Sequence, residues 1–183
     1  MTPMKTTLLM LVCVVSLQAQ APPCAISVEL RAIYEADRSD RETGDFEGRD
    51  LVSRDADRSR RVGEILAAGI DPCPEDLYNA AMVYQHGGGA PGYLRAHVLA
   101  AAAAARGHQR ARWLSAAALD RYLQAIEQPQ IFGTQFNQYD DQPWTQEPFD
   151  RSFLSLPLRD LFNVADPAKQ ASRLDGLNNP DGK

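Results

Sequence analysis

The stretch from Pro74 to Phe136 most constrains the fold, because it holds three apolar segments with helical spacing that are separated by glycines. Pro74 followed by two acidic residues is typical of a helix start, and the glycines at 87–89 and at 107 interrupt the helical pattern. The first segment is apolar on nearly every side, which indicates a central, buried helix. The five alanines at 101–105 allow neighbouring backbones to approach closely. We therefore expect three antiparallel helices joined by short links, at 74–86, 91–106 and 109–126.

Length and composition fit one globular domain. The chain has 183 residues, of which 44% are hydrophobic and 23% are charged. Residues 130–138 alternate like a strand, and a turn at 140–143 with a partner at 144–149 predicts a small β-hairpin. The predicted fold is mainly α, with an antiparallel helical core of about five helices, this small β-hairpin and short C-terminal helices. Apolar spacing and capping residues predict the remaining helices at 26–41, 51–68, 157–162 and 167–174.

The N-terminal segment has the pattern of a cleaved secretory signal. Lys5 supplies positive charge, residues 7–17 form an apolar run, and Ala19 and Ala21 are the small residues that a signal peptidase reads. The apolar run is too short to span a bilayer comfortably, so we expect no stable membrane anchor. We predict a periplasmic or extracellular protein, cleaved after either alanine. The expected boundaries are 1–21 for the signal peptide, 26–174 for a single helical domain and 175–183 for a flexible tail.

Export changes how the cysteines are interpreted. Cys13 would leave with the signal, so that Cys24 and Cys73 remain as a pair in an oxidising compartment. We expect these two to form a disulfide, and closing so long a loop would stabilise the fold by about 4 kcal/mol. The alternative is a free, reactive thiol at Cys73, which stands beside the start of a helix.

The charge pattern excludes some partners and leaves two interpretations open. The net charge is −5, and no basic patch is large enough to follow a phosphate backbone or an anionic membrane, so we expect no nucleic-acid partner. Asp37 and Arg41 continue the apolar stripe of the first helix, where they form either a buried pair or an ordinary solvated i,i+4 pair. The four arginines between 54 and 61 form either an anion cradle or, with their acidic neighbours, a salt-bridged surface.

Several separated motifs stand in a fixed order along the chain, including QHG at 85–87 and GTQF at 133–136. They resemble a bacterial family of unknown function that shares these QHG and GTQF signatures, and the resemblance covers residues 32–174. It implies no catalytic residue. Residues 84–111 show a weaker, local similarity to Sel-type helical repeats, relatives of the tetratricopeptide repeats that serve as protein-binding scaffolds. Only one such unit is present, whereas a stacked array needs about three or more.

The candidate site lies at the two ends of the central stretch, between the QHG turn and the GTQF segment. Our leading hypothesis is a ligand- or protein-binding module of the cell envelope, with an unknown small ligand or protein partner. The alternative is a small hydrolase-like enzyme with His86 as general base and Asp120 orienting it. Structural roles are open too, with His86 capping a helix end and the amides satisfying buried backbone groups. The candidate ligand-binding residues are Gln85, His86, Arg121, Gln130, Thr134 and Gln135.

Other catalytic patterns are missing from the sequence. No HExxH motif and no paired CxxC motif occurs, so we expect no metal site and no cofactor. The GxSxG motif of the α/β-hydrolases is also missing, and Ser115 falls inside a predicted helix.

Overall fold

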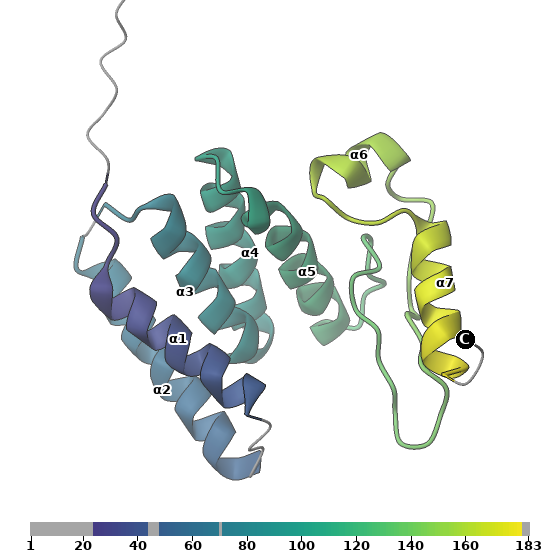
Figure 1. Cartoon of the computed structure of the whole chain (residues 1–183), viewed down its shortest axis with the longest axis horizontal. Coiled ribbons are helices and arrows are strands. Elements are labelled where there is room, and N and C mark those ends of the chain that lie inside the picture. Colours follow the sequence, from purple (N-terminus) through teal and green to yellow (C-terminus); the bar gives the residue numbers. More distant parts are fainter. Residues whose placement is uncertain (1–23, 44–47, 70, 181–183) are drawn as a thin grey trace, which may run out of the picture.

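The computed structural model describes residues 24–43, 48–69 and 71–180, and this part of the chain is mainly helical (Figure 1). Each predicted helix is present, with ends that shift by a few residues. The last helix continues past Leu174, where the predicted domain ends, and the predicted signal peptide lies outside the described residues. The helices are α1 (Val28–Glu42), α2 (Gly48–Ala67), α3 (Pro74–His86), α4 (Gly89–Ala105), α5 (Gln109–Ala125), α6 (Leu156–Leu161) and α7 (Pro167–Asn178).

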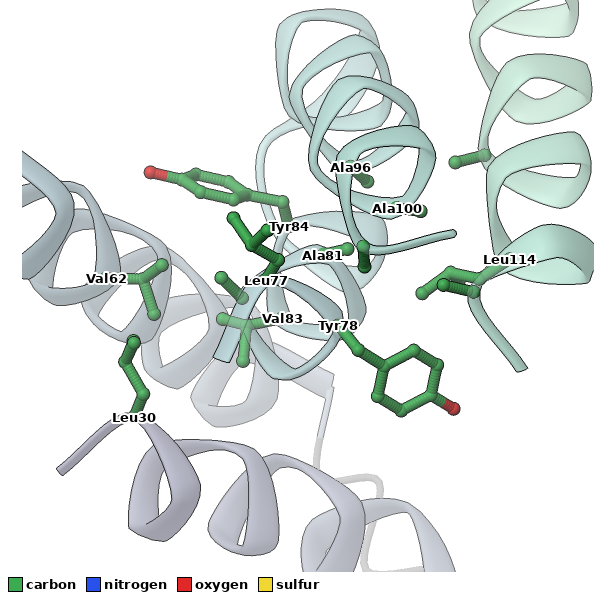
Figure 2. Packing of buried hydrophobic residues seen from close by; sticks show 14 of the residues in the cluster. Leu30, Val62, Leu77, Tyr78, Ala81, Val83, Tyr84, Ala96, Ala100 and Leu114 are labelled. Carbon is green, nitrogen blue, oxygen red and sulfur yellow. The ribbon is translucent and has the colours of Figure 1, made fainter. Parts of the chain in front are cut away.

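Helix α3 is central, as its apolar surface predicts. Figure 1 shows α1 and α2 on one side of α3 and α4 and α5 following on the other, and α3 contacts all four of these helices. Small side chains line the seams, among them the fully buried Ala96, Ala100 and Ala103 of α4 (Figure 2). Larger apolar residues fill the space between α1, α2 and α3, where Leu30, Val62 and Val83 meet. Because the alanine side chains are small, the backbones of α3, α4 and α5 pack close together. This close packing fixes the ends of the three helices relative to one another.

A disulfide ties the start of α1 to the start of α3. Cys24 and Cys73 are bonded, which confirms the predicted pair. The carboxylate of Asp76 strengthens the same junction, because its two oxygens accept hydrogen bonds from the backbone N–H of Ser27 at 2.9 Å and of Cys73 at 3.0 Å. The disulfide and the buried carboxylate of Asp76 therefore both hold the start of α1 beside the start of α3.

The predicted β-hairpin is wrong, since the described residues contain no β-strand. Two isolated bridges occur instead, a parallel one between Gln130 and Phe149 and an antiparallel one between Asn137 and Thr145. The physical reason is that the side chains of Asp120 and Gln130, rather than a partner strand, accept from the backbone N–H groups of Ile131, Phe132, Thr134 and Gln135. Pro148 also lacks an N–H group to donate to a ladder.

The C-terminal helices pack around this irregular segment. Phe132 and Val164 form a second apolar cluster with Ala116 of α5, and Phe162 packs against it. In the described part of the chain, no helix combines the length and apolarity that crossing a membrane requires.

Candidate functional site

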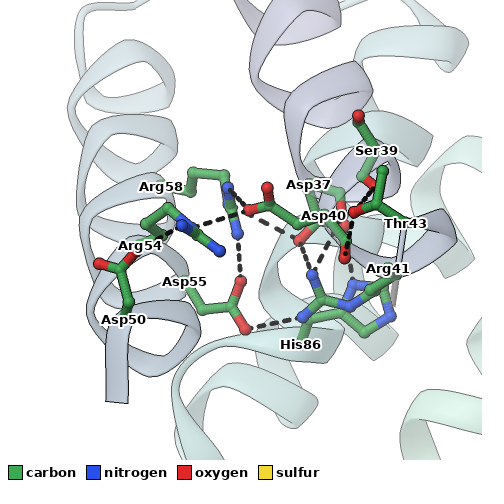
Figure 3. Close-up of polar contacts among 10 residues, drawn as sticks. All are labelled: Asp37, Ser39, Asp40, Arg41, Thr43, Asp50, Arg54, Asp55, Arg58 and His86. Atoms are coloured by element: carbon green, nitrogen blue, oxygen red, sulfur yellow. Dashed lines mark hydrogen bonds and ion pairs between the residues drawn. The ribbon is translucent and has the colours of Figure 1, made fainter. Parts of the chain in front are cut away.

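His86, the last residue of α3, is held by a carboxylate of α1. Its Nδ1 lies 2.8 Å from Oδ2 of Asp37, whose side chain is 1% exposed (Figure 3). Oδ1 of Asp37 accepts a hydrogen bond from Nη1 of Arg41 at 2.9 Å. Asp37 is therefore buried, as the first of the two interpretations expects, whereas the Arg41 side chain is 23% exposed, so the pair is neither fully buried nor an ordinary solvated one. The carboxylate that orients His86 is Asp37.

The pair belongs to a larger charge cluster between α1 and α2 (Figure 3). Asp55 accepts hydrogen bonds from Nη2 of Arg41 at 2.7 Å and from Nη2 of Arg58 at 2.6 Å. Arg58 also donates to Asp40 at 2.7 Å. The charges alternate in sign, so the arginines are neutralised within the cluster rather than left to cradle an anion. The charge cluster comprises Asp37, Asp40, Arg41, Asp55, Arg58 and His86.

The pKa values of Asp55 and Arg58 reflect their contacts with groups of opposite charge. Burial alone would raise the pKa of Asp55, but the hydrogen bonds from Arg41 and Arg58 outweigh it and leave the pKa below its ordinary value. Burial likewise opposes the ionised form of Arg58, yet its bonds to Asp55 and Asp40 raise its pKa. The contacts within the cluster therefore favour the ionised forms of Asp55 and Arg58.

The other residues of the QHG motif also have structural roles. A Cβ on Gly87 would lie 2.6 Å from the backbone oxygen of Asp55, so only glycine lets α2 approach this closely. Ser59 of α2 donates to the carbonyl of Gly87 at 2.8 Å. Gln85 is buried, and its Oε1 has no hydrogen-bond partner in the described part of the chain. The QHG turn thus fastens α3 to α1 and α2.

Asp120 anchors the segment that follows α5. It is fully buried, and its Oδ1 accepts from the backbone N–H groups of Ile131 at 2.9 Å and Phe132 at 3.0 Å. Its Oδ2 accepts from the N–H of Thr134 at 2.8 Å and from the hydroxyl of Thr134 at 2.7 Å. Both oxygens are therefore occupied by this loop, and the proposed pairing of Asp120 with His86 finds no support in the geometry.

Amide side chains complete the loop. Oε1 of Gln130 accepts from the N–H of Gln135 at 3.0 Å, and its Nε2 donates to the carbonyl oxygens of Gln135 and Gln146. Gln146 in turn donates to the carbonyl of Gly133 at 2.6 Å. Gly133 has φ +65°, and a Cβ there would lie 2.5 Å from the ring of Phe149. Gln130 thus binds backbone groups, as the structural interpretation of the amides proposed. The hydroxyl of Thr134 instead donates to the side chain of Asp120 and accepts from the side chain of Gln135.

A buried arginine that the sequence analysis missed joins this loop to the C-terminal helices. Nη2 of Arg159 donates to the carbonyl oxygens of Phe132 at 2.7 Å and Ala165 at 2.8 Å, and to Oε1 of Gln170 at 2.9 Å. Burial lowers the pKa of Arg159. Its place within residues 32–174, which the family resemblance covers, was the available signal. We call the set of Asp120, Gln130, Gln146, Arg159 and Gln170 the loop-anchoring network.

The remaining predicted residues, Arg121 and Gln135, meet in a pocket of about 390 Å³. The pocket lies where the start of α4, the end of α5 and residues 135–137 come together. Gln85, His86, Gln130 and Thr134 do not line it. We call it the Arg121 pocket, and it is lined by Tyr93, Arg121, Gln124, Ala125, Gln135, Phe136 and Asn137.

Arg121 is the least compensated charge of this region. Among the described residues, no carboxylate lies within ion-pair distance of it, and its Nε is buried without a hydrogen-bond acceptor. Burial lowers the pKa of Arg121 more than the nearby Tyr93 raises it, and the positive charge of Arg41 lowers it further. Nδ2 of Asn137, which lines the same pocket, is also buried without an acceptor. Both atoms are enclosed by the protein and do not face the pocket that their residues line.

The other two histidines have local partners. Nδ1 of His97 lies 3.0 Å from the backbone oxygen of Ser115, and Nδ1 of His108 accepts from the N–H of Ala111 at the start of α5. The ring of His108 stacks on Tyr78 with centroids 4.4 Å apart. Across the described ranges, no three His, Cys, Asp or Glu side chains gather as a metal ion would require.

A larger groove of about 640 Å³ lies over α2 and α4 and contains none of the predicted site residues. Its walls are mainly apolar and include Leu66, Leu94, Val98 and Leu99. Because none of the predicted site residues lines this groove, we place the candidate site at the smaller, polar Arg121 pocket.

The chain matches no protein-family model, and comparisons with curated proteins and with solved structures found no match. The resemblance to the family with QHG and GTQF signatures and the similarity to Sel-type repeats therefore stay predictions.

Proposed function

We propose that this protein is an exported binding module of the cell envelope that holds a small polar ligand in the Arg121 pocket. The observation that carries the proposal is that Arg121 is the one charged residue among those lining this pocket, and that no described carboxylate is paired with it. A partly buried guanidinium without a carboxylate partner can bind a polar or anionic ligand.

The contrast with neighbouring polar residues supports the proposal. Asp120 and Gln130 use their side chains on backbone groups, and Asp37 is paired with Arg41 and His86. Packing and folding account for those residues. They do not account for Arg121, whose burial lowers its pKa and so opposes the charged form. Its interaction with Tyr93 of α4 favours the charged form but does not offset the effect of burial.

Export is part of the proposal. The N-terminal pattern predicts a secretory signal, and the Cys24–Cys73 disulfide is of the kind that persists in oxidising compartments. Binding is favoured over hydrolysis because the carboxylate proposed to assist His86 is fully occupied by the loop after α5.

Filling the pocket tests the proposal. Ala125 is exposed at its edge, so Ala125→Trp narrows the pocket without entering the core. The control is Ala102→Trp, at an exposed position of α4 away from this pocket. A library of small polar compounds is screened by ligand-observed NMR and thermal shift. We expect compounds that bind the wild type and Ala102→Trp but not Ala125→Trp. If every compound that binds the wild type also binds Ala125→Trp equally well, the pocket is not the binding site.

A further inference from the structure

We infer that the apolar groove over α2 and α4 is a second binding site, and that its ligand is an unbranched, medium-chain fatty acid. The groove has a volume of about 640 Å³, which lies within the usual range for ligand sites. It shares no residue with the Arg121 pocket, so this site does not depend on the proposed function. Its eight lining residues are Gly63, Leu66, Tyr84, Pro91, Leu94, Arg95, Val98 and Leu99.

The apolar wall of the groove is exposed to solvent. Leu94 and Val98 are 40% and 58% exposed and lie one turn apart on α4, which buries Ala96 and Ala100 on its other side. Leu66 of α2 forms part of the same groove. Exposed apolar surface that is continuous typically marks a binding site, because covering it removes it from water. An aliphatic chain lying along α4 would cover this wall.

The polar groups of the groove lie next to each other. Arg95 is the only charged lining residue, and it is paired with no carboxylate of the described chain. Its exposed guanidinium lies over the ring of Tyr84, with Cζ 5.6 Å from the ring centroid. The hydroxyl of Tyr84 makes no hydrogen bond within the described part of the chain and is not one of the enclosed, unbonded polar atoms. Figure 2 shows this hydroxyl pointing away from Ala96 and Ala100.

Gly63 gives the hydroxyl of Tyr84 room beside α2. A Cβ at residue 63 would lie 3.0 Å from the hydroxyl oxygen of Tyr84 and would crowd it. Glycine inside a helix is less favourable than alanine, and this close approach accounts for its presence in α2. A guanidinium beside a phenol hydroxyl offers one charged and one neutral donor, which together suit the two oxygens of a carboxylate.

The polar and apolar ends of the groove are ordered as the ends of a fatty acid are. Side chains of a helix lean toward its N-terminus, so that of Arg95 leans toward Pro91. Val98 and Leu99 lie about one turn further along α4. From Pro91 to Val98 the helix rises about 10.5 Å, which suits a chain of medium length such as that of octanoate or decanoate.

The size of the groove favours a small ligand over a second copy of the chain. A stable dimer uses about 20–30 residues on each side, whereas eight residues line this groove. The net charge of −5 also makes two copies repel each other. A fatty acid instead brings one negative charge to the unpaired Arg95.

Fatty acids of increasing length test this site by isothermal titration calorimetry. Hexanoate, octanoate and decanoate, each below its micelle concentration, vary the tail. Octanamide keeps the tail of octanoate and removes its charge. The methyl NMR signals of Leu94 and Val98 report whether the ligand lies in the groove.

Two variants and two matched controls accompany these probes. Arg95→Gln removes the charge, and its control is Arg110→Gln, because Arg110 lies over the ring of Tyr78 as Arg95 lies over that of Tyr84. Val98→Gln interrupts the apolar wall at an exposed position. Its control is Val52→Gln, since Val52 is exposed on α2 and does not line the groove.

We expect each methylene that becomes buried to tighten binding by up to about fourfold. Octanoate should bind at least fivefold more tightly than octanamide and should shift the signals of Leu94 and Val98. Arg95→Gln should abolish the preference for the acid, Val98→Gln should weaken binding of both ligands, and the two controls should behave as the wild type does.

Equal affinities for octanoate and octanamide, or affinities that do not change with tail length, would overturn the fatty-acid site. It also fails if Ala125→Trp, rather than Val98→Gln, removes binding, because the acid then occupies the Arg121 pocket. It fails as well if no acid binds. In that case, a dimer in sedimentation velocity that dissociates in Val98→Gln would show that a second copy covers the groove.

Discussion

The charge cluster joins helices α1, α2 and α3 through side chains alone, whereas the loop-anchoring network joins side chains to the backbone of an irregular segment. In the cluster, Arg41 contacts both Asp37 and Asp55, so each arginine keeps a carboxylate when another is lost. In the network, the N–H groups of Ile131 and Phe132 have Asp120 as their acceptor. Redundancy is therefore high where regular helices meet and low where side chains replace a β-ladder.

The Arg121 pocket lies between these regions and belongs to neither. Arg159 and Arg121 are both arginines whose pKa is lowered by burial, but Arg159 donates to two carbonyl oxygens and to Gln170. Both also have one buried guanidinium nitrogen without an acceptor, Nε in Arg121 and Nη1 in Arg159. The two arginines therefore differ in the bonds that Arg159 makes to the backbone and to Gln170, which tie it to the fold.

Asp120→Asn should produce the largest effect, because an amide leaves the donors of Thr134 facing an NH₂ group instead of an oxygen. We expect a loss of about 3 kcal/mol in the free energy of unfolding, measured by urea denaturation. Asp141→Asn is the control, since Asp141 is exposed in a turn of the same loop. A loss below about 1 kcal/mol would contradict the low redundancy that we assign to the network.

The stability of Asp120→Asn would also test why the β-hairpin prediction was wrong. The helices were predictable because proline, glycine and apolar spacing act locally, as at Pro74 and Gly87. The hairpin prediction was wrong because an alternating pattern at 130–138 does not reveal that Asp120, on the preceding helix, takes the N–H groups that a strand would use.

The candidate site was predictable only in part, for the same reason. Arg121 and Gln135 were named from the motifs, and they line one pocket. Tyr93 and Asn137 were missed because their proximity depends on how α4, α5 and the loop pack. The pairing of His86 with Asp37 was missed as well, since the two are 49 positions apart in the sequence.

Asp55→Asn should have a smaller effect, because Arg41 keeps Asp37 and Arg58 keeps Asp40 as partners. We expect a loss of about 1.5 kcal/mol at pH 7. The pKa of Asp55 is lowered from the ordinary 3.8, so its contribution is complete above pH 3.8 and is lost as the pH falls below that value. Urea denaturation between pH 7 and pH 2.5 should therefore show the wild type losing its advantage over Asp55→Asn in acid. An advantage that stays constant down to pH 2.5 would contradict this pKa.

Arg121→Met should change the free energy of unfolding least, and whether that change is a gain or a loss is informative. Methionine fills much of the same volume and removes an ion whose charged form burial opposes, so the free energy of unfolding should stay within about 0.5 kcal/mol of the wild type or rise. The matched substitution Arg159→Met should cost about 3 kcal/mol, because it leaves the carbonyl oxygens of Phe132 and Ala165 without this donor. Equal losses for the two variants would mean that Arg121 stabilises the fold as Arg159 does, and the main reason to place a ligand beside it would disappear.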